Sequence, residues 1–521
     1  MNLVEALVVA LACAAVSRFY LHMLQLESYQ LDGYLRWMNN NRERLFGATL
    51  AVGLTATVAS LLLPLFFMMF ARRSGQMIGD IVALVGFAAA ALYTFQAQYI
   101  VAQKKPLVFT PRMIRLASCQ TVLILLFALL LSALGIPAYL LFIAVPYLPL
   151  ASGFLMQPVE RRIHAKFANQ AKARLGQIDG LIKIGITGSF GKTSTKFALA
   201  TILAEKYRTF ASPGSTNTPM GLSRVINEQL EDDCEVFIAE MGSRHVGDIR
   251  ELCELVEPQY GVITSIGAAH LETFGNIATV GSAKYELIES LPENGCAFFG
   301  TGGEIDKLYA RCSMRKISAG IETGNVRAYD IESGPFGSRF TLARGEEHVR
   351  CETQLLGRHN IANIALASAV ALELGLKLPE IARGIRKIRP VEHRLQLIRG
   401  AVTVIDDAFN SNPEGAKEAL RVLSDFLGQR IIVTPGMVEM GEEEERYNYI
   451  FGTQIATVCD AAILVGAKHT RPIAKGLVQS GFDRNRIFVV ASLDEAQERL
   501  KEIAKNGDVV LFENDLPDNY S

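Results

Sequence analysis

Long apolar runs fill the first 156 positions of the chain, and shorter runs alternating with polar segments fill the rest. Five of the long runs are close to the roughly 20 residues that a helix needs to cross a bilayer. They are Leu3–Leu24, Phe46–Phe70, Ile78–Ala97, Leu116–Leu134 and Pro137–Met156. The pattern predicts an α-helical transmembrane bundle of about five helices over residues 1–156. Four crossing helices and one interfacial segment remain the alternative.

Basic residues between the runs predict an orientation. Three stretches that would share one side of the membrane contain Arg36, Arg42, Arg44, Lys104, Lys105, Arg112, Arg115, Arg161, Arg162 and Lys166. Only Arg72 and Arg73 fall on the other side. Because basic loops stay in the cytoplasm, everything after residue 157 is expected on the cytoplasmic side.

Residues 157–180 form a connector with one apolar helical face. Ile163, Phe167, Ala171 and Leu175 are spaced four apart, and the basic residues lie elsewhere. This pattern is typical of a helix on a membrane surface and equally of a helix that packs against the following domain.

From residue 181 the pattern is typical of parallel α/β domains. Short apolar runs that end in glycine or polar residues alternate with helical periodicity, as in "LIKIGITG", "CEVFIAEMG" and "YGVITSIG". A break near Arg394–Ile398 separates a central α/β domain, residues 181–394, from a C-terminal α/β domain, residues 395–521.

Charge and cysteine content argue against a nucleic-acid-binding protein and against a protein built on disulfides or a zinc site. The formal net charge of the 521 residues is -1, so no overall basic field exists to attract nucleic acid. The 8 cysteines are scattered and form no CxxC pair, which is typical of buried thiols in a reducing compartment.

The stretch "GITGSFGKTST", residues 185–195, has the context of a phosphate loop, because it follows a predicted strand and begins a predicted helix. Gly188 and Gly191 would let backbone N–H groups approach phosphate oxygens. Lys192 would reach the terminal phosphates, and Thr193 would offer a hydroxyl to Mg²⁺. The spacing is GxxGKT, since Ile186 occupies the position of the usual first glycine.

This GxxGKT loop resembles that of the Mur ligase family, particularly its D-alanyl-D-alanine-adding branch, and further motifs follow in the family's order. The resemblance implies an ATP-dependent, ADP-forming amide ligase with a P-loop central domain and a Rossmann-like C-terminal domain. It implies ATP contacts from Ser189 and Ser194, and it makes Glu240, His270 and Lys284 catalytic metal-site residues alongside Lys192. Lys284 would carry CO₂ as a carbamate. Thr193 and Glu240 would hold one Mg²⁺, and Glu240, His270 and Lys284 a second.

The remaining family motifs imply substrate and nucleotide contacts. "PGSTNTPMG" places Asn217 and Thr218 near the carboxylate substrate, and "VIDDAFNSNP" adds Asn410 and Asn412. The implied ATP contacts outside the phosphate loop are Asn360, Asn363, Arg394 and Asp407. An asparagine helix cap would explain Asn360 equally well.

Four departures from the family concern substrates and adenine. Ser265-Ile266-Gly267 replaces Asn-Ile-Gly, "FFGTGGEID" replaces a segment with Asn-x-Asp, Tyr447 stands near a histidine position, and "FENDLPDNYS" replaces Lys-Gly-Ser. The apolar leader also stands where family members bind a soluble UDP-sugar. The carboxylate donor could therefore be lipid-linked, or a polymer for export.

We therefore expect a ligase anchored in the bacterial cytoplasmic membrane, multi-pass, with its catalytic domains in the cytoplasm. It would join a carboxylate envelope precursor to an amino acid or dipeptide through an acyl phosphate, in peptidoglycan-like biosynthesis, and would contact membrane lipid but not nucleic acid. A poly-γ-glutamate-type synthetase and a nucleotide-driven transport or signalling protein are the alternatives. The sequence leaves the oligomeric state open.

Overall fold

The computed structural model of the chain describes residues 2–99, 106–268, 271–409, 411–438 and 440–515. Contacts between residues divide the chain into two compact units. The first ends at His164 and the second covers Ala165–Leu516. Helix α5 (Leu148–Gln177) contributes residues to both.

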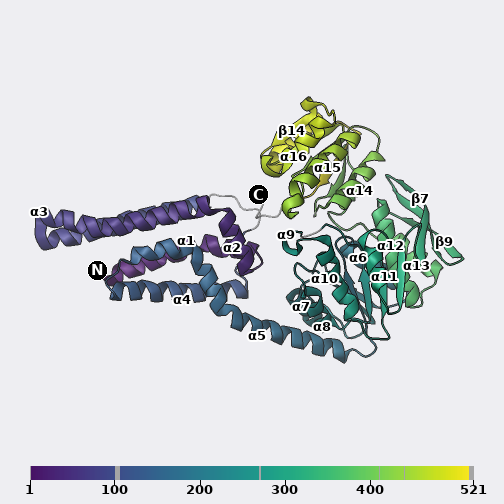
Figure 1. Cartoon of the computed structure of the whole chain (residues 1–521), viewed down its shortest axis with the longest axis horizontal. Helices are drawn as coiled ribbons and strands as arrows, with labels where there is room; N and C mark the ends of the chain where they lie inside the picture. The colour runs from purple at the N-terminus through teal and green to yellow at the C-terminus, as the bar shows by residue number, and fades with distance from the viewer. Residues whose placement is uncertain (1, 100–105, 269–270, 410, 439, 516–521) are drawn as a thin grey trace. The chain divides into compact units, whose positions relative to one another are not determined.

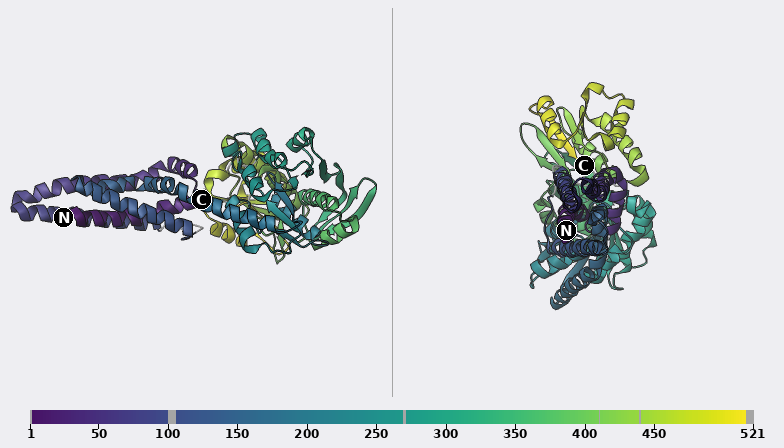
Figure 2. Two further views of the ribbon diagram at one scale, coloured as in Figure 1. Left: turned by 90° about the horizontal axis from the view of Figure 1, so that it is seen from below. Right: turned by 90° about the vertical axis from the view of Figure 1, so that its left-hand side faces the viewer.

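Among the described residues of the first unit, every regular element is a helix. It contains α1 (Asn2–Leu26), α2 (Leu31–Asn40), α3 (Arg42–Tyr99), α4 (Pro111–Ala133), the 3-10 helix η1 (Ala138–Tyr147) and the start of α5. Figure 2 shows α1, α3 and α4 running alongside one another. Val16, Tyr20, Tyr34, Phe87 and Phe142 belong to its buried core. Most of the large hydrophobic side chains that the described chain exposes also lie on this unit.

Among the described residues, five helical segments are long and apolar enough to cross a membrane, judged by length and composition. They are Leu3–Leu26, Thr49–Met69, Gln76–Ala97, Pro111–Ala133 and Ala138–Gln177. The last differs from the simple helix expected over Pro137–Met156, because it begins as the 3-10 helix η1, with Pro146 inside it. Proline removes one backbone N–H and restricts the preceding residue, which favours such an irregular start.

Helix α3 doubles back on itself, so that its two apolar halves pack together (Figure 1). A Cβ atom added at Gly79 would lie 2.5 Å from the Cα atom of Pro64. Fifteen residues of straight helix would separate these positions by about 22 Å. The two predicted spans therefore form a hairpin, and Gly79 permits the close approach of its halves.

The larger sheet of the second unit has nine strands in the order β2-β3-β1-β4-β5-β6-β7-β8-β9. The parallel strands are β1 (Ile182–Thr187), β2 (Thr209–Ala211), β3 (Val236–Glu240), β4 (Tyr260–Ile263), β5 (Cys296–Phe299) and β6 (Lys316–Ile321). Strands β7 (Val326–Gly334), β8 (Gly337–Arg344) and β9 (Glu347–Thr353) form an antiparallel meander, with β7 parallel to β6.

Helices cover this sheet and join its strands. They are α6 (Lys192–Leu203), α7 (Pro219–Gln229), α8 (Asp248–Val256), α9 (Leu271–Phe274), α10 (Ile277–Glu289), α11 (Glu304–Arg311), α12 (Arg358–Glu373) and α13 (Leu378–Lys387). Ala171 and Leu175 of α5 are buried in the same core as Phe237 of β3. Of the two roles open for the connector, this part of α5 has the packing role.

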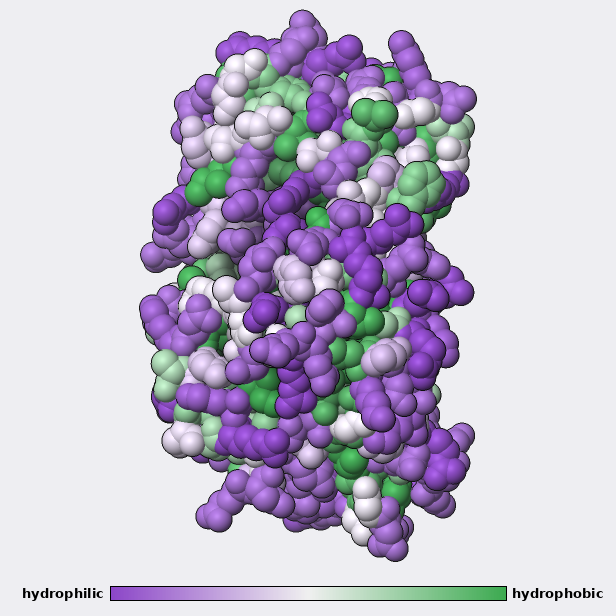
Figure 3. All heavy atoms as spheres, turned by 90° about the vertical axis from the view of Figure 1, so that its right-hand side faces the viewer, coloured by the Kyte–Doolittle hydropathy of each residue, from purple (hydrophilic) through white to green (hydrophobic). Residues whose placement is uncertain are grey.

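The smaller sheet has six strands in the order β10-β11-β15-β12-β13-β14. They are β10 (Gln396–Ile398), β11 (Thr403–Asp407), β12 (Arg430–Thr434), β13 (Ala461–Val465), β14 (Ile487–Val490) and β15 (Val509–Glu513), parallel except for β10. The accompanying helices are α14 (Pro413–Ser424), η2 (Gly441–Glu443), α15 (Glu444–Val458), α16 (Ala467–Gln479), η3 (Arg484–Arg486) and α17 (Leu493–Ile503). The face of the second unit in Figure 3 is largely hydrophilic.

The prediction of two parallel α/β arrangements is confirmed, and each quoted apolar run contains a strand of the structure. The carboxyl ends of β1, β3 and β4 meet at one edge of the larger sheet. The first candidate residues follow these strand ends.

Candidate active site

The loop between β1 and α6 has the backbone shape of a phosphate cradle. Gly188 has φ +148° and Gly191, the residue before α6, has φ +80°, which both favour glycine. A Cβ atom at Gly188 would lie 2.1 Å from Thr264 Oγ1, and one at Gly191 would lie 2.5 Å from Asn363 Oδ1. The loop is thus closed between the segment after β4 and helix α12, and its N–H groups stand at a helix N-terminus.

Ser265 supports this loop although it departs from the family's asparagine. The Phe190 N–H donates to Ser265 Oγ at 3.0 Å, and the Ser189 N–H donates to the Ser265 carbonyl at 2.8 Å. The Gly267 N–H donates to Ser189 Oγ at 3.1 Å. A shorter side chain therefore still fixes the loop, and this departure leaves the cradle intact.

Lys192 lies folded over its own loop. Its Nζ donates to the carbonyls of Gly188 at 2.7 Å and Ser189 at 3.3 Å. Burial lowers the pKa of Lys192 to about 8, with Glu240 opposing the shift and Arg394 adding to it. A bound phosphate would supply the negative charge that this ammonium lacks.

Glu240, at the end of β3, is held by two side chains. Lys196 Nζ lies 3.0 Å from its Oε2 and Asn217 Nδ2 donates to its Oε1 at 3.1 Å. Lys196 is 0% and Glu240 1% exposed, so the ion pair is buried. Burial alone raises the pKa of Glu240, but the attraction of Lys196 and Lys192 wins and lowers it. The carboxylate is therefore ionised beside the phosphate loop.

Lys284 of α10 is buried. Its Nζ donates a short hydrogen bond, 2.6 Å, to the neutral hydroxyl of Ser243. Burial, with Lys192 adding to it, lowers the pKa of Lys284 well below its usual value. Its amine is thus favoured in the neutral form, which is the nucleophilic form.

Arg394 connects the smaller sheet's domain to the phosphate loop. Its Nη2 donates to Thr193 Oγ1 at 3.4 Å, and its guanidinium lies 4.3 Å from the ring centroid of Phe409. Burial lowers the pKa of Arg394, with Glu240 and Asp407 opposing the shift. A second cation therefore faces the place where phosphates would lie.

Asp407 ends β11 beside Glu513, its register partner at the end of β15. The Leu395 N–H donates to Asp407 Oδ1 at 3.1 Å, and Ser411 Oγ donates to Glu513 Oε1 at 2.5 Å. Glu513 is 1% exposed, and burial together with Asp407 raises its pKa well above the usual value. The ionised form of Glu513 is therefore disfavoured beside Asp407.

Comparison with known proteins gives consistent matches over both sheets. The Mur ligase middle domain matches residues 186–371, and the Mur ligase glutamate ligase domain matches residues 393–513. UDP-N-acetylmuramoyl-tripeptide--D-alanyl-D-alanine ligase of Mycobacterium bovis is 31% identical over 379 residues, covering 67% of this chain and 72% of that protein. The Bacillus subtilis protein of the same name is 28% identical over 347 residues, covering 66% and 74%.

The chain belongs to the Mur ligase family.

Solved structures agree with this assignment. MurF from Acinetobacter baumannii superposes with a TM-score of 0.62 at 26% identity and covers 67% of this chain and 77% of that chain. MurF ligase from Thermotoga maritima in complex with ADP gives a TM-score of 0.61 at 25% identity, covering 67% and 80%. This Mur ligase is therefore an ATP-dependent, ADP-forming ligase, as its motifs imply.

Oxygen atoms near the phosphate loop of this Mur ligase fit Mg²⁺. Among the residues that the structure describes, no three His, Cys, Asp or Glu side chains gather into a metal cage. Mg²⁺ needs no such cage, because it commonly takes one or two protein oxygens together with phosphates and water. The Thr193 hydroxyl and the ionised Glu240 carboxylate would hold it, and the ion would neutralise phosphate charge there.

The other predicted site residues have mixed placements. Asn363 lies against the loop, and Asn217 is fixed by Glu240. Thr218 and Asn412 accept N–H groups as the caps of α7 and α14. Asn360 donates to the Leu356 carbonyl at 2.9 Å, and Gly357 occupies the cap position instead. Ser194 lies in the first turn of α6, and His270 and Asn410 lie outside the described residues.

Three residues at this site were missed by sequence reasoning. Lys196 follows Lys192 by one helical turn, a spacing that places both on one helix face and could have indicated it. Ser243 stands two residues after Glu240 past a glycine, and Glu513 ends an apolar run. Neither carries a distinctive pattern, since each acquires its role only from a neighbouring strand or helix.

Proposed function

We propose that this Mur ligase forms an amide bond between the carboxylate of a peptidoglycan precursor and an amino acid or dipeptide, through an acyl phosphate, while anchored in the bacterial cytoplasmic membrane. The observation that carries the proposal is the convergence of Lys192, Glu240 and Arg394 on one phosphate loop. Two of them lie in the larger sheet's domain, and Arg394 lies in the segment that leads into β10 of the smaller sheet, so the nucleotide would lie where the two domains meet.

The charges suit phosphoryl transfer to a carboxylate. The carboxylate oxygen would attack the γ-phosphorus, the bond to the ADP oxygen would break, and an acyl phosphate would form. An amine would then attack the acyl carbon and release phosphate. Lys192 and Arg394 would stabilise charge on the moving phosphoryl group, and no side-chain nucleophile is required.

Lys284 supports a carbamate in this proposal. A neutral amine can attack CO₂, forming an N–C bond and releasing a proton, and burial favours that neutral form. The resulting carboxylate would offer oxygen to a second Mg²⁺ near Glu240. Ser243, now 2.6 Å from Nζ, would remain within reach of the new group.

Membrane anchoring is supported by the five apolar helical segments and by the exposed hydrophobic side chains of the first unit. The substrate class is supported by relatives that are named as ligases of UDP-N-acetylmuramoyl-tripeptide and D-alanyl-D-alanine. Neither the polymer synthetase nor the transport protein is favoured by these relatives. A lipid-linked carboxylate donor fits the anchored arrangement.

Trapping the acyl phosphate tests the reaction. The full-length protein would be incubated with ATP, Mg²⁺ and UDP-N-acetylmuramoyl-tripeptide or its lipid-linked form, with hydroxylamine as the amine. A hydroxamate is expected with wild type and not with Lys192→Met. Lys284→Ala should lose it and regain part of it with a short carboxylic acid. ATP turnover that no amine stimulates, with no hydroxamate from either donor, would contradict the proposal.

A further inference from the structure

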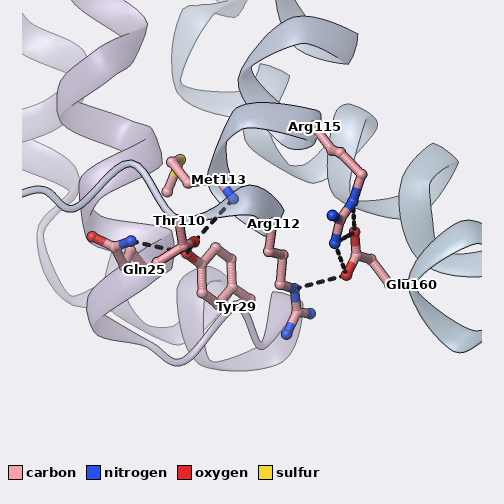
Figure 4. A network of polar contacts seen from close by, with 7 residues as sticks. All are labelled: Gln25, Tyr29, Thr110, Arg112, Met113, Arg115 and Glu160. Carbon is pink, nitrogen blue, oxygen red and sulfur yellow. Dashed lines mark hydrogen bonds and ion pairs between the residues drawn. The ribbon is translucent and has the colours of Figure 1, made fainter. Parts of the chain in front are cut away.

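A polar network joins three helices at one end of the first unit (Figure 4). Gln25 Nε2 donates to the Tyr29 hydroxyl at 2.8 Å, and the Tyr29 and Thr110 hydroxyls are 3.1 Å apart. The Thr110 hydroxyl in turn accepts the Met113 N–H at 3.2 Å and caps α4. These hydrogen bonds fix the end of α1, Tyr29 just after it and the start of α4 relative to one another.

Two arginines of α4 share one carboxylate of α5. Arg115 donates from Nε and Nη2 to the two oxygens of Glu160 at 2.7 and 2.9 Å. Arg112 reaches the same carboxylate only through Nε, at 3.7 Å. Glu160 is 10% exposed in its side chain, so its charge is committed to this pair of cations. One positive charge remains in excess.

Arg112 is held so that its fork faces outward. Its guanidinium lies 4.4 Å from the ring centroid of Tyr29, a cation–π contact that fixes the plane of the group. Figure 4 shows the two terminal nitrogens pointing away from Glu160. Among the described residues, no acceptor lies within hydrogen-bond distance of them, and the side chain is 35% exposed. A rigid, partly desolvated fork is what a phosphate group binds well.

Exposed apolar side chains lie in the two segments that carry Arg112 and its partner Glu160. Val108 and Phe109, just before α4, are each 55% exposed, and Phe154 and Leu155 of α5 are exposed as well. Arg161, next to Glu160, is exposed. A cation at the border between exposed apolar side chains and a polar helix surface matches the depth of lipid phosphates.

We propose that Arg112, on its Tyr29 platform, binds the phosphate of a membrane lipid headgroup. The proposal rests on the membrane anchoring proposed above, and it adds a lipid site where the end of α1 and the start of α4 lie beside the middle of α5. A free phosphate offers the same anion, but it would gain nothing from Val108, Phe109 and the apolar side chains of α5. Glu160 and Arg115 hold the site in shape and do not bind the ligand.

The test uses the full-length protein purified in detergent and titrated with phosphatidic acid, with bound lipid counted by native mass spectrometry. Arg112→Gln should weaken binding by at least about tenfold, because a charge-assisted contact is lost. Arg161→Gln, which removes a neighbouring exposed arginine, should bind like wild type. Tyr29→Leu should weaken binding several-fold while leaving Arg112 in place, and circular dichroism would confirm that each variant is folded.

Two results would overturn the lipid site. One is equal binding by wild type and Arg112→Gln, or an equal loss in Arg161→Gln, which would make the attraction unspecific. The other is complete displacement of phosphatidic acid by inorganic phosphate at the same concentration, which would make it a free-phosphate site. Failure of the anchoring itself would instead appear as release of the protein from cell membranes by alkaline carbonate.

Discussion

Lys196 and Glu240 form an ion pair that is buried on both sides, with Nζ 3.0 Å from Oε2. The lysine also donates to the Gly214 carbonyl at 2.5 Å, and the carboxylate accepts from Asn217. Lys196 therefore orients Glu240, the expected metal ligand, and keeps it ionised. Lys196 is not among the site residues that the family motifs imply. Removing one partner would leave the other charge buried without its ion-pair partner.

Lys196→Met should lower the free energy of unfolding by about 3–5 kcal/mol, as measured by urea denaturation of the full-length protein in detergent. Lys307→Met is the matched control, because Lys307 pairs with Glu304 but its side chain is 73% exposed. Its effect should stay below about 1 kcal/mol. Adding Glu240→Leu to Lys196→Met should recover part of the loss. A Lys196→Met protein as stable as the control would show that the buried pair does not hold the site.

The pKa of Lys192, lowered to about 8, predicts proton uptake when ATP binds. In the free protein about half of these side chains are neutral at pH 8, and phosphate contact should restore the charged form. Calorimetry in buffers of different ionisation enthalpy should detect an uptake of roughly 0.5 proton at pH 8. At pH 6 the lysine is already protonated, so uptake from this group should vanish.

Lys192→Arg provides the control for that measurement, because an arginine stays charged throughout this pH range. It should bind ATP without the uptake at pH 8. An unchanged uptake in Lys192→Arg would assign the proton to another group, and an uptake that persists at pH 6 would do the same.

Sequence patterns predicted the parallel strands and the phosphate loop well, because both are local. The run before Gly188 is mostly apolar, with Leu181, Ile182, Ile184 and Ile186, and it leads directly to the glycine that the loop requires. The meander of β7, β8 and β9 was not predicted, since its strands face solvent on one side and mix exposed with buried residues. Lys196 was also missed, because a lysine in a helix usually faces water. Its ion-pair partner Glu240 lies on β3, which the local sequence of α6 does not reveal.

Features that depend on tertiary contacts between distant segments could not be predicted, because no local sequence pattern encodes them. The pKa of Glu513 is raised because β15 lies beside β11, which buries the carboxyl next to Asp407, and this strand order follows from the packing of the whole smaller sheet. The joining of two apolar runs into α3 likewise depends on a contact between residues fifteen positions apart. The sequence indicated the polar residues at the strand ends, but not the neighbouring residues that shift their pKa values.

Arg394 should matter for catalysis because it reaches the phosphate loop from the other domain. Arg394→Ala should lower kcat/KM for ATP by about 100-fold, which corresponds to roughly 2.7 kcal/mol of lost transition-state stabilisation. Arg399→Ala is the control, since Arg399 likewise lies over an aromatic ring, Phe336, at 4.5 Å but donates to the Pro335 carbonyl on the surface. Steady-state phosphate release would measure both. Equal losses in the two variants would indicate a general stability effect instead of a role at the phosphates.

Gly79 and Gly86 provide a test of the α3 hairpin, because they lie in the same helix half with different surroundings. A Cβ atom at Gly79 would lie 2.5 Å from the Pro64 backbone, whereas one at Gly86 would meet nothing within 4 Å. Gly79→Ala should destabilise the first unit by about 1–3 kcal/mol through overpacking. Gly86→Ala should stabilise it by up to about 1 kcal/mol, because alanine favours a helix over glycine. Thermal unfolding of the two variants in detergent would decide, and a Gly79→Ala protein as stable as Gly86→Ala would mean that the two halves of α3 do not pack as a hairpin.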